Sequence, residues 1–259
     1  MELQWCVYCT ATPPQNSAVV TSTEEELLTR CETAHVLVQK GDLPALVEEV
    51  DDGQRRMIKL WWFSKRGWRQ APHPGFARFC RASETLRTRD FIAPMITERG
   101  EVPGTPVRWV AYPKIAGDPL NQLSNAARIE LLPALTRWVK RLHDAGCYCR
   151  GLHLGNVLVL PGHDLALIDV ADTRFNRRPL GYAKRVRNLG SFLAHPPDNA
   201  WWKVSAGEAL VRSYAEVQGL DQPKLWSDVS RQIAMRTRKR TRQRRRRGLD
   251  PLPEGEYTE

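Results

Sequence analysis

Residues 150–172, which read RGLHLGNVLVLPGHDLALIDVAD, decide the fold of this chain. They contain two short apolar runs, NVLVL and LALI, joined by the turn-forming sequence PGHD. The pattern predicts a β-hairpin with buried strands. His153 and Asn156 lie at the start of the first run, and Asp169 follows the second. A hairpin of this kind brings an amide and a carboxylate together, where they are suited to hold a metal ion bound to a polyphosphate.

Upstream of the hairpin, the sequence alternates short strands with two helices. Turn signals at Gly41-Asp42 and at Asp51-Asp52-Gly53 separate the first three strands. The predicted strands are residues 34–39, 45–50, 56–63, 91–97 and 107–112, and the predicted helices are residues 24–31 and 76–87. In the second helix, Phe76, Phe79, Ser83 and Leu86 form one stripe, with Glu84 beside it. Lys59 lies among apolar neighbours on the third strand, where an exposed lysine is an equally good interpretation.

Around and after the hairpin, the sequence is mainly helical. Apolar residues recur at helical spacing over residues 129–142; Pro133 either kinks this helix or begins a new one, and Gly146 is a natural C-terminal cap. Further helices are predicted over residues 187–193, 202–218 and 224–247, with a polar connection at 198–202.

The element order predicts an α+β protein of two lobes, a small β-rich N-lobe and a mainly helical C-lobe, with a cleft between them. The expected divisions are an N-terminal extension at 1–22, an N-lobe at 23–113, a C-lobe at 114–235 and a basic C-terminal tail at 236–259.

The net charge of +10 is concentrated near the C-terminus. Residues 236–247 contain eight Arg and one Lys, while four acids follow at 250–259. Such a segment is expected to bind a polyanion, either the anionic surface of a membrane or a nucleic acid. No aromatic side chain is interleaved with these charges, so stacking on single-stranded bases is not indicated.

The six cysteines and the distribution of apolar residues indicate where the protein is expected to be located in the cell. Cys6-x-x-Cys9 and Cys147-x-Cys149 lack nearby histidine partners, so reduced thiols are expected rather than zinc ligands. No apolar run reaches the roughly 18 residues that a membrane span requires. The first residues have neither a basic region nor a long apolar region, so a secretory signal is not expected.

The order of Lys59, Glu84, Tyr112-Pro113, His153-Leu154-Gly155-Asn156 and Ile168-Asp169 resembles the protein-kinase-like fold. Within that fold, the segment LHDAGCYCRGLHLGNVLVLPGHDLALIDVADTRF is most similar to bacterial lipopolysaccharide core kinases, which phosphorylate heptose or Kdo sugars of the inner core. The resemblance covers roughly residues 34–215. It implies ATP and Mg²⁺ as cofactors and lipopolysaccharide core, or another phosphorylated glycolipid, as partner.

The resemblance also implies roles for individual residues. Asp169 matches the metal-binding Asp, and Asn156 matches the catalytic-loop Asn that ligates metal. Lys59 matches the strand lysine that grips the α- and β-phosphates, and Glu84 is the best candidate for the helix glutamate that pairs with it. Tyr112 belongs to the linker next to the expected nucleotide site. Without the resemblance, the simplest interpretation is that Asp169 and Asn156 cap turns and that Lys59 and Glu84 are surface charges.

The sequence departs from the family pattern in two places. The expected phosphate loop, VQKGDLPA, contains only Gly41. The catalytic-loop Asp that accepts the proton of the substrate hydroxyl should stand at 151, where this sequence has Gly151; His153 or Asp172 is the candidate replacement. The basic residues that follow Asp172 fit a substrate bearing phosphate or carboxylate groups, or a solvated surface.

Three functions follow from these patterns. The first is a sugar kinase of lipopolysaccharide core assembly, peripheral at the cytoplasmic face of the inner membrane. The second is a catalytically impaired pseudokinase with a scaffold or regulatory role in envelope assembly. The third, from another class, is an RNA-associated basic protein.

Overall fold

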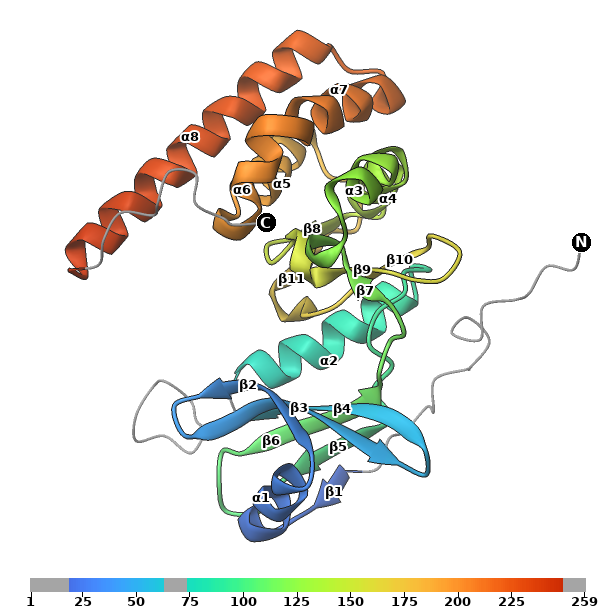
Figure 1. Ribbon diagram of the computed structural model, residues 1–259, viewed down its shortest axis with the longest axis vertical. Coiled ribbons are helices and arrows are strands. Elements are labelled where there is room, and N and C mark those ends of the chain that lie inside the picture. Colours follow the sequence, from blue (N-terminus) through green and yellow to red (C-terminus); the bar gives the residue numbers. More distant parts are fainter. Residues whose placement is uncertain (1–18, 63–73, 249–259) are drawn as a thin grey trace, which may run out of the picture. The chain divides into compact units, whose positions relative to one another are not determined.

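The computed structural model describes residues 19–62 and 74–248, and this part of the chain has an α+β fold (Figure 1). Contacts divide it into two compact units. Unit 1 comprises the described residues up to Ala116 together with Leu167–Ala171, and unit 2 comprises Gly117–Ala166 with the described residues from Asp172 onward. The first two cysteines and the acidic C-terminal residues lie outside the described residues.

Unit 1 is built on a mixed sheet of six strands in the order β1-β5-β6-β4-β3-β2. β1 pairs with β5 in parallel, and the other pairs are antiparallel. The strands are β1 (Val19–Thr21), β2 (His35–Lys40), β3 (Leu43–Asp51), β4 (Gln54–Trp61), β5 (Glu98–Glu101) and β6 (Arg108–Pro113), and the helices are α1 (Glu24–Glu32) and α2 (Pro74–Arg87). The predicted strand–helix–strand order is therefore confirmed. The first strand lies in the segment predicted to be an extension, because its β-branched residues pair with β5.

One helix covers each face of this sheet (Figure 1). Successive side chains of β4 point to opposite faces. Ile58 and Leu60 belong to a buried cluster that also contains Leu27 of α1. On the other face, the ring of Trp61 packs against Phe79 of α2, with centroids 5.7 Å apart. The predicted apolar stripe of α2 is thus its buried side.

The connection after α2 corrects one sequence prediction. Residues 91–97 do not form a regular strand; Ile92 makes an isolated bridge, and its carbonyl accepts the N–H of Leu167. Pro94 lacks the N–H that a ladder requires, which interrupts the pairing. The strand instead occupies Glu98–Glu101, where a turn was predicted.

Unit 2 contains six helices and short strands among the described residues. The strands are β7 (Asp118–Pro119), β8 (Cys147–Cys149), β9 (Val157–Val159), β10 (Leu165–Leu167) and β11 (Thr173–Phe175). The helices are α3 (Asn125–Glu130), α4 (Leu132–Asp144), α5 (Tyr182–Leu193), α6 (Pro196–Trp201), α7 (Gly207–Gln218) and α8 (Gln222–Arg246), and a π-helical turn, Trp202–Ala206, joins α6 to α7. Three-residue 3-10 turns occur at Leu120–Gln122 and Leu154–Asn156, and a third, Val170–Asp172, joins the segment 167–171 of unit 1 to unit 2.

Several local predictions in unit 2 are confirmed. β9 and β10 form the predicted hairpin beside β7, and Gly162 in its turn has φ of +85°. Pro133 lies in the first turn of α4, so it begins a helix rather than kinking one. Gly146 follows α4 with φ of +73°, as expected for a helix end. The predicted polar connection at 198–202 is wrong: these residues lie in α6 and the π-helical turn, because Pro196 and Pro197 begin a helix before Asp198.

A buried polar network joins α4, α5 and α7 in the centre of unit 2. The Tyr214 hydroxyl lies 2.7 Å from His143 Nδ1 and accepts a hydrogen bond from Arg185 Nη1. His143 Nε2 lies 3.0 Å from Asn188 Oδ1, and Arg185 also pairs with Asp144. Since Arg185 can only donate, the tyrosine proton is directed to His143 Nδ1, and His143 Nε2 donates to Asn188. The histidine is therefore neutral in the folded state.

Candidate functional site

Lys59 lies on β4, on the face of the sheet that α2 covers. Its Nζ is 4.9 Å from the centroid of the Phe79 ring, a cation–π distance. The side chain is only 19% exposed, because β6 and α2 flank it. The alternative of a solvated lysine on an outer face is therefore wrong.

Asp169 follows the hairpin and returns to unit 1 within the segment 167–171. Its carboxylate Oδ1 accepts a hydrogen bond of 2.5 Å from Lys59 Nζ. The backbone of Asp169 has φ of +53°, in the left-handed region that few residues other than glycine and Asn or Asp adopt. The Asp169 side chain is 56% exposed. An exposed carboxylate is thus held beside a largely buried ammonium group.

The other two predicted nucleotide residues of unit 1 lie in different surroundings. Glu84 is exposed on α2 and forms no ion pair within residues 19–62 and 74–248, so the expected partner of Lys59 is replaced by Asp169. Tyr112 is buried on β6, and its ring packs against Phe79 at 5.8 Å. Burial, with a smaller contribution from the negative charge of Asp169, raises the pKa of Tyr112 well above its usual range. Its hydroxyl therefore stays protonated at neutral pH.

The catalytic-loop segment of unit 2 is fixed by its own backbone. Asn156 ends the 3-10 turn Leu154–Asn156, and its Nδ2 donates to the Gly151 carbonyl at 2.9 Å. This bond uses the amide nitrogen, and within residues 19–62 and 74–248 Oδ1 accepts no hydrogen bond. Asn156 is 9% exposed. An amide oxygen presented in this way fits the ligand preference of Mg²⁺.

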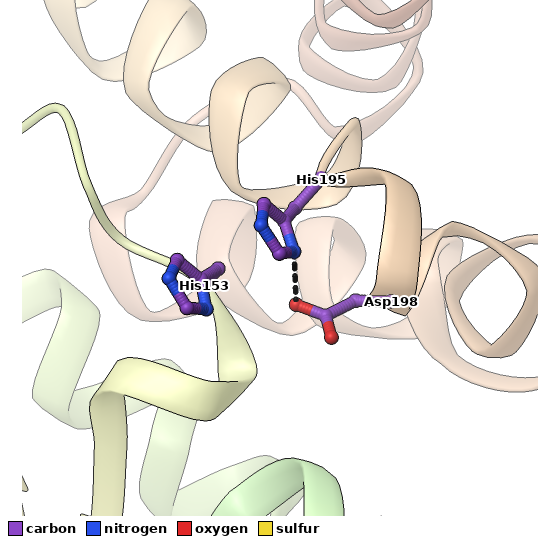
Figure 2. Close-up of side chains that lie close together, drawn as sticks. All are labelled: His153, His195 and Asp198. Atoms are coloured by element: carbon purple, nitrogen blue, oxygen red, sulfur yellow. Dashed lines mark hydrogen bonds and ion pairs between the residues drawn. The ribbon is translucent and has the colours of Figure 1, made fainter. Parts of the chain in front are cut away.

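His153, which begins this loop, stacks on His195, and Asp198 completes the group (Figure 2). The two imidazole rings are 4.1 Å apart at an interplanar angle of 6°. His195 Nδ1 lies 3.1 Å from Asp198 Oδ2, and because a carboxylate only accepts, this nitrogen carries a proton. The ligand atoms of the three residues lie within 4.8 Å of one another, close enough for a metal ion. The lone pairs of two stacked, parallel rings lie in separate parallel planes, so one ring would have to rotate before both could bind one ion.

Asp198 also anchors the loop, a function that the sequence did not reveal. Its side chain is 1% exposed, and its Oδ2 accepts the backbone N–H of Leu154 at 2.8 Å. The residue follows two prolines in α6. An acid next to two prolines indicates the start of a helix, and this signal was present in the sequence. It does not identify the partner of the carboxylate, the N–H of Leu154, which lies 44 residues upstream.

The basic stretch after the hairpin divides into two kinds of residue. Arg185 is buried and pairs with Asp144, so it is structural and unsuited to a substrate. Asp172, a candidate proton acceptor, is exposed at the end of a 3-10 turn. The remaining basic residues of this stretch are also exposed: Arg174, Arg177, Arg178, Lys184 and Arg187.

The turn expected to cover phosphates is short. Gly41, with φ of +66°, lies between β2 and β3, and a Cβ there would meet nothing within 4 Å. The neighbouring strand β2 is exposed along its whole length. The β2–β3 hairpin therefore has one glycine in its turn, and its β2 strand is exposed to solvent.

Comparison of the sequence with protein-family models gives no match, and comparison with curated proteins gives none either. The helices of the described ranges include none that is long and apolar enough to cross a membrane.

Proposed function

We propose that this chain is an ATP- and Mg²⁺-dependent phosphotransferase of protein-kinase-like fold. We propose an inner-core sugar of lipopolysaccharide as the acceptor, phosphorylated at the cytoplasmic face of the inner membrane. The observation that carries the proposal is the contact between Lys59 Nζ and Asp169 Oδ1. Phosphoryl transfer depends on positioning and charge neutralisation, for which a lysine and a metal-binding acid are the recurring protein groups.

Stability alone gives little reason for this contact. An ion pair with one partner 56% exposed contributes at most about 1 kcal/mol. The left-handed backbone of Asp169 costs a comparable amount, about 1 kcal/mol. The two terms nearly cancel, so the arrangement is better explained by a ligand that uses both groups.

The proposal gives each residue a role. Bound Mg²⁺ would neutralise the charge of the β- and γ-phosphates, with Asp169 and Asn156 assigned as its protein ligands. Lys59 is assigned to the α- and β-phosphates, and Tyr112, which like Lys59 packs against Phe79, is assigned to the nucleotide site. Glu84, which is exposed on α2, has no role in this proposal, because Asp169 takes the place of the expected partner of Lys59.

The proton of the acceptor hydroxyl needs another group, because Gly151 has no side chain. His153 and Asp172 are the assigned candidates. A largely dissociative transition state requires the base only late, so a weaker acceptor slows the reaction without abolishing it.

Gly151 also favours a second candidate function. A chain that binds nucleotide without transferring phosphate would have a scaffold or regulatory role in envelope assembly. The absent acid is the residue that defines the chemistry, so only a turnover assay separates the two functions.

Nucleotide binding is tested by thermal unfolding with ATP and Mg²⁺. At about 100 times the dissociation constant, ATP stabilises the folded state by about 2.7 kcal/mol, or roughly 5 °C for a protein of this size. Asp169→Asn, which tolerates the left-handed backbone, is expected to abolish the Mg²⁺-dependent part of this shift. Asp164→Asn, at an exposed position in the hairpin turn, is the matched control and should retain it.

Turnover is tested with labelled ATP and purified core lipid. Transfer that depends on Asp169 supports the kinase, whereas Mg²⁺-dependent binding without transfer supports the non-catalytic protein. An ATP shift that is absent, or identical in Asp169→Asn and wild type, contradicts both.

A further inference from the structure

The C-terminal part of α8 is uniformly basic. Residues 229–248 contain ten Lys or Arg residues and no Asp or Glu. Arg231 still pairs with Asp228 of the preceding turn. Beyond it, the exposed basic residues form no ion pair with any residue of 19–62 or 74–248: Arg238, Lys239, Arg242, Arg245, Arg246 and Arg247. A surface with this much unneutralised charge attracts anionic molecules.

The opposite side of α8 is fixed to its own unit. Leu225 and Val229 are fully buried. Gly190 of α5 allows a close approach, since a Cβ there would lie 2.5 Å from the Cβ of Gln232. Further along, Arg240 Nη1 donates to the Ala194 carbonyl at the end of α5. The helix therefore presents only its outer side.

Helical spacing places one set of residues on that outer side. Positions three and four apart lie on the same face of a helix. The set, here called the basic face, lines one common surface: Met235, Arg238, Lys239, Arg242, Gln243 and Arg246. Met235 is 47% exposed at the start of the basic face, and it is the one large apolar side chain of the set.

We propose that the basic face binds the surface of an anionic lipid bilayer. A one-sided, nearly continuous row of guanidinium and ammonium groups matches a flat array of lipid phosphates. Residues 227–248 also contain no aromatic side chain for stacking on bases.

This inference deepens the proposed function by naming the surface at which the acceptor is met. It does not depend on phosphotransfer, because vesicle binding is measured without nucleotide. A failure of one proposal is therefore distinguishable from a failure of the other.

The test is co-sedimentation of the full chain with vesicles of phosphatidylcholine containing about 30 mol% phosphatidylglycerol, at about 0.1 M salt. The triple variant Arg238→Gln, Arg242→Gln, Arg246→Gln keeps helix-forming residues while removing three charges. Each charge near an anionic surface changes the partition coefficient about fivefold, so the triple variant is expected to bind about 100-fold more weakly. Raising the salt to about 0.5 M should release the wild type.

A matched control removes three exposed charges elsewhere in unit 2: Arg137→Gln, Lys203→Gln and Arg212→Gln. It is expected to bind within about threefold of the wild type. Equal binding of the triple variant and the wild type overturns the proposal, as does equal binding to vesicles of phosphatidylcholine alone. If a nucleic-acid duplex at equal phosphate concentration strips the wild type from the anionic vesicles, the partner is a nucleic acid instead.

Discussion

Acidification from about pH 7.5 to about pH 5 is expected to destabilise unit 2 by about 2 kcal/mol through one buried histidine. His143 is fully buried, and burial lowers its pKa from the ordinary value of 6.5 to about 4. Its Nδ1 accepts a hydrogen bond from the Tyr214 hydroxyl, and the hydroxyl oxygen itself accepts a hydrogen bond from Arg185. Protonating Nδ1 would therefore remove this hydrogen bond and add a charge beside a guanidinium group.

The sign follows from the lowered pKa. As the pH falls below 6.5, the unfolded chain binds a proton at this histidine, while the folded chain does not until about pH 4. Stability is therefore complete above the unfolded pKa and is lost between these two values. At about pH 5, proton binding at this histidine shifts the folding equilibrium roughly 30-fold toward the unfolded state, which corresponds to about 2 kcal/mol.

The measurement is urea unfolding of wild type and His143→Gln at both pH values. Glutamine can accept from Tyr214 and donate to Asn188 but does not titrate in this range. The variant is expected to be less stable overall, yet its loss on acidification should be smaller than that of the wild type by about 2 kcal/mol. Other carboxylates, including Asp144, titrate in both proteins and cancel in the comparison. An equal pH dependence in the two proteins would refute the reasoning.

Three further predictions concern packing and hydrogen bonds. Gly100→Ala is expected to destabilise unit 1 by about 3 kcal/mol in urea unfolding, because the new Cβ would lie 1.8 Å from the Trp109 ring; an unchanged midpoint would contradict this packing. Asp198→Asn weakens the hydrogen bond to the Leu154 N–H, so hydrogen exchange at that amide should accelerate by about tenfold or more, and equal exchange would show that the carboxylate does not anchor the loop. Thr23→Ala removes the capping box of α1 and should cost about 1 kcal/mol, a loss that Thr23→Ser should largely restore.

Local sequence signals predicted most elements of the fold. The hairpin in the quoted stretch follows from two apolar runs and a Pro-Gly turn, all within a few residues. Thr23 caps α1 and forms a capping box with Glu26, three residues further on, so this helix start also depends on near neighbours. Pro133 and Gly146 mark the ends of α4 because each restricts the backbone by itself. Such features are set by neighbouring residues, so they are available without the tertiary structure.

Features set by distant contacts were not available in this way. β5 begins at Glu98 because its ladder with β6 pairs Glu98 with Ala111, and no local pattern selects that register. Nothing in the residues around Asp198 identifies the N–H of Leu154 as the partner of its carboxylate. Such pairings follow from topology rather than from propensity.

The partner of Lys59 shows which part of a site prediction can be made from helical geometry alone. Order along the chain suggested Glu84, but the α2 stripe that contacts Lys59 is centred on Phe79. Five residues separate Phe79 from Glu84, which at about 100° per residue directs Glu84 about 140° away from it around the helix. The stripe was visible in the sequence, so the exposure of Glu84 could have been predicted from it. Asp169, which lies 110 residues further on, could not have been identified as the partner, because a chain reversal that brings 167–171 back to unit 1 leaves no local signal.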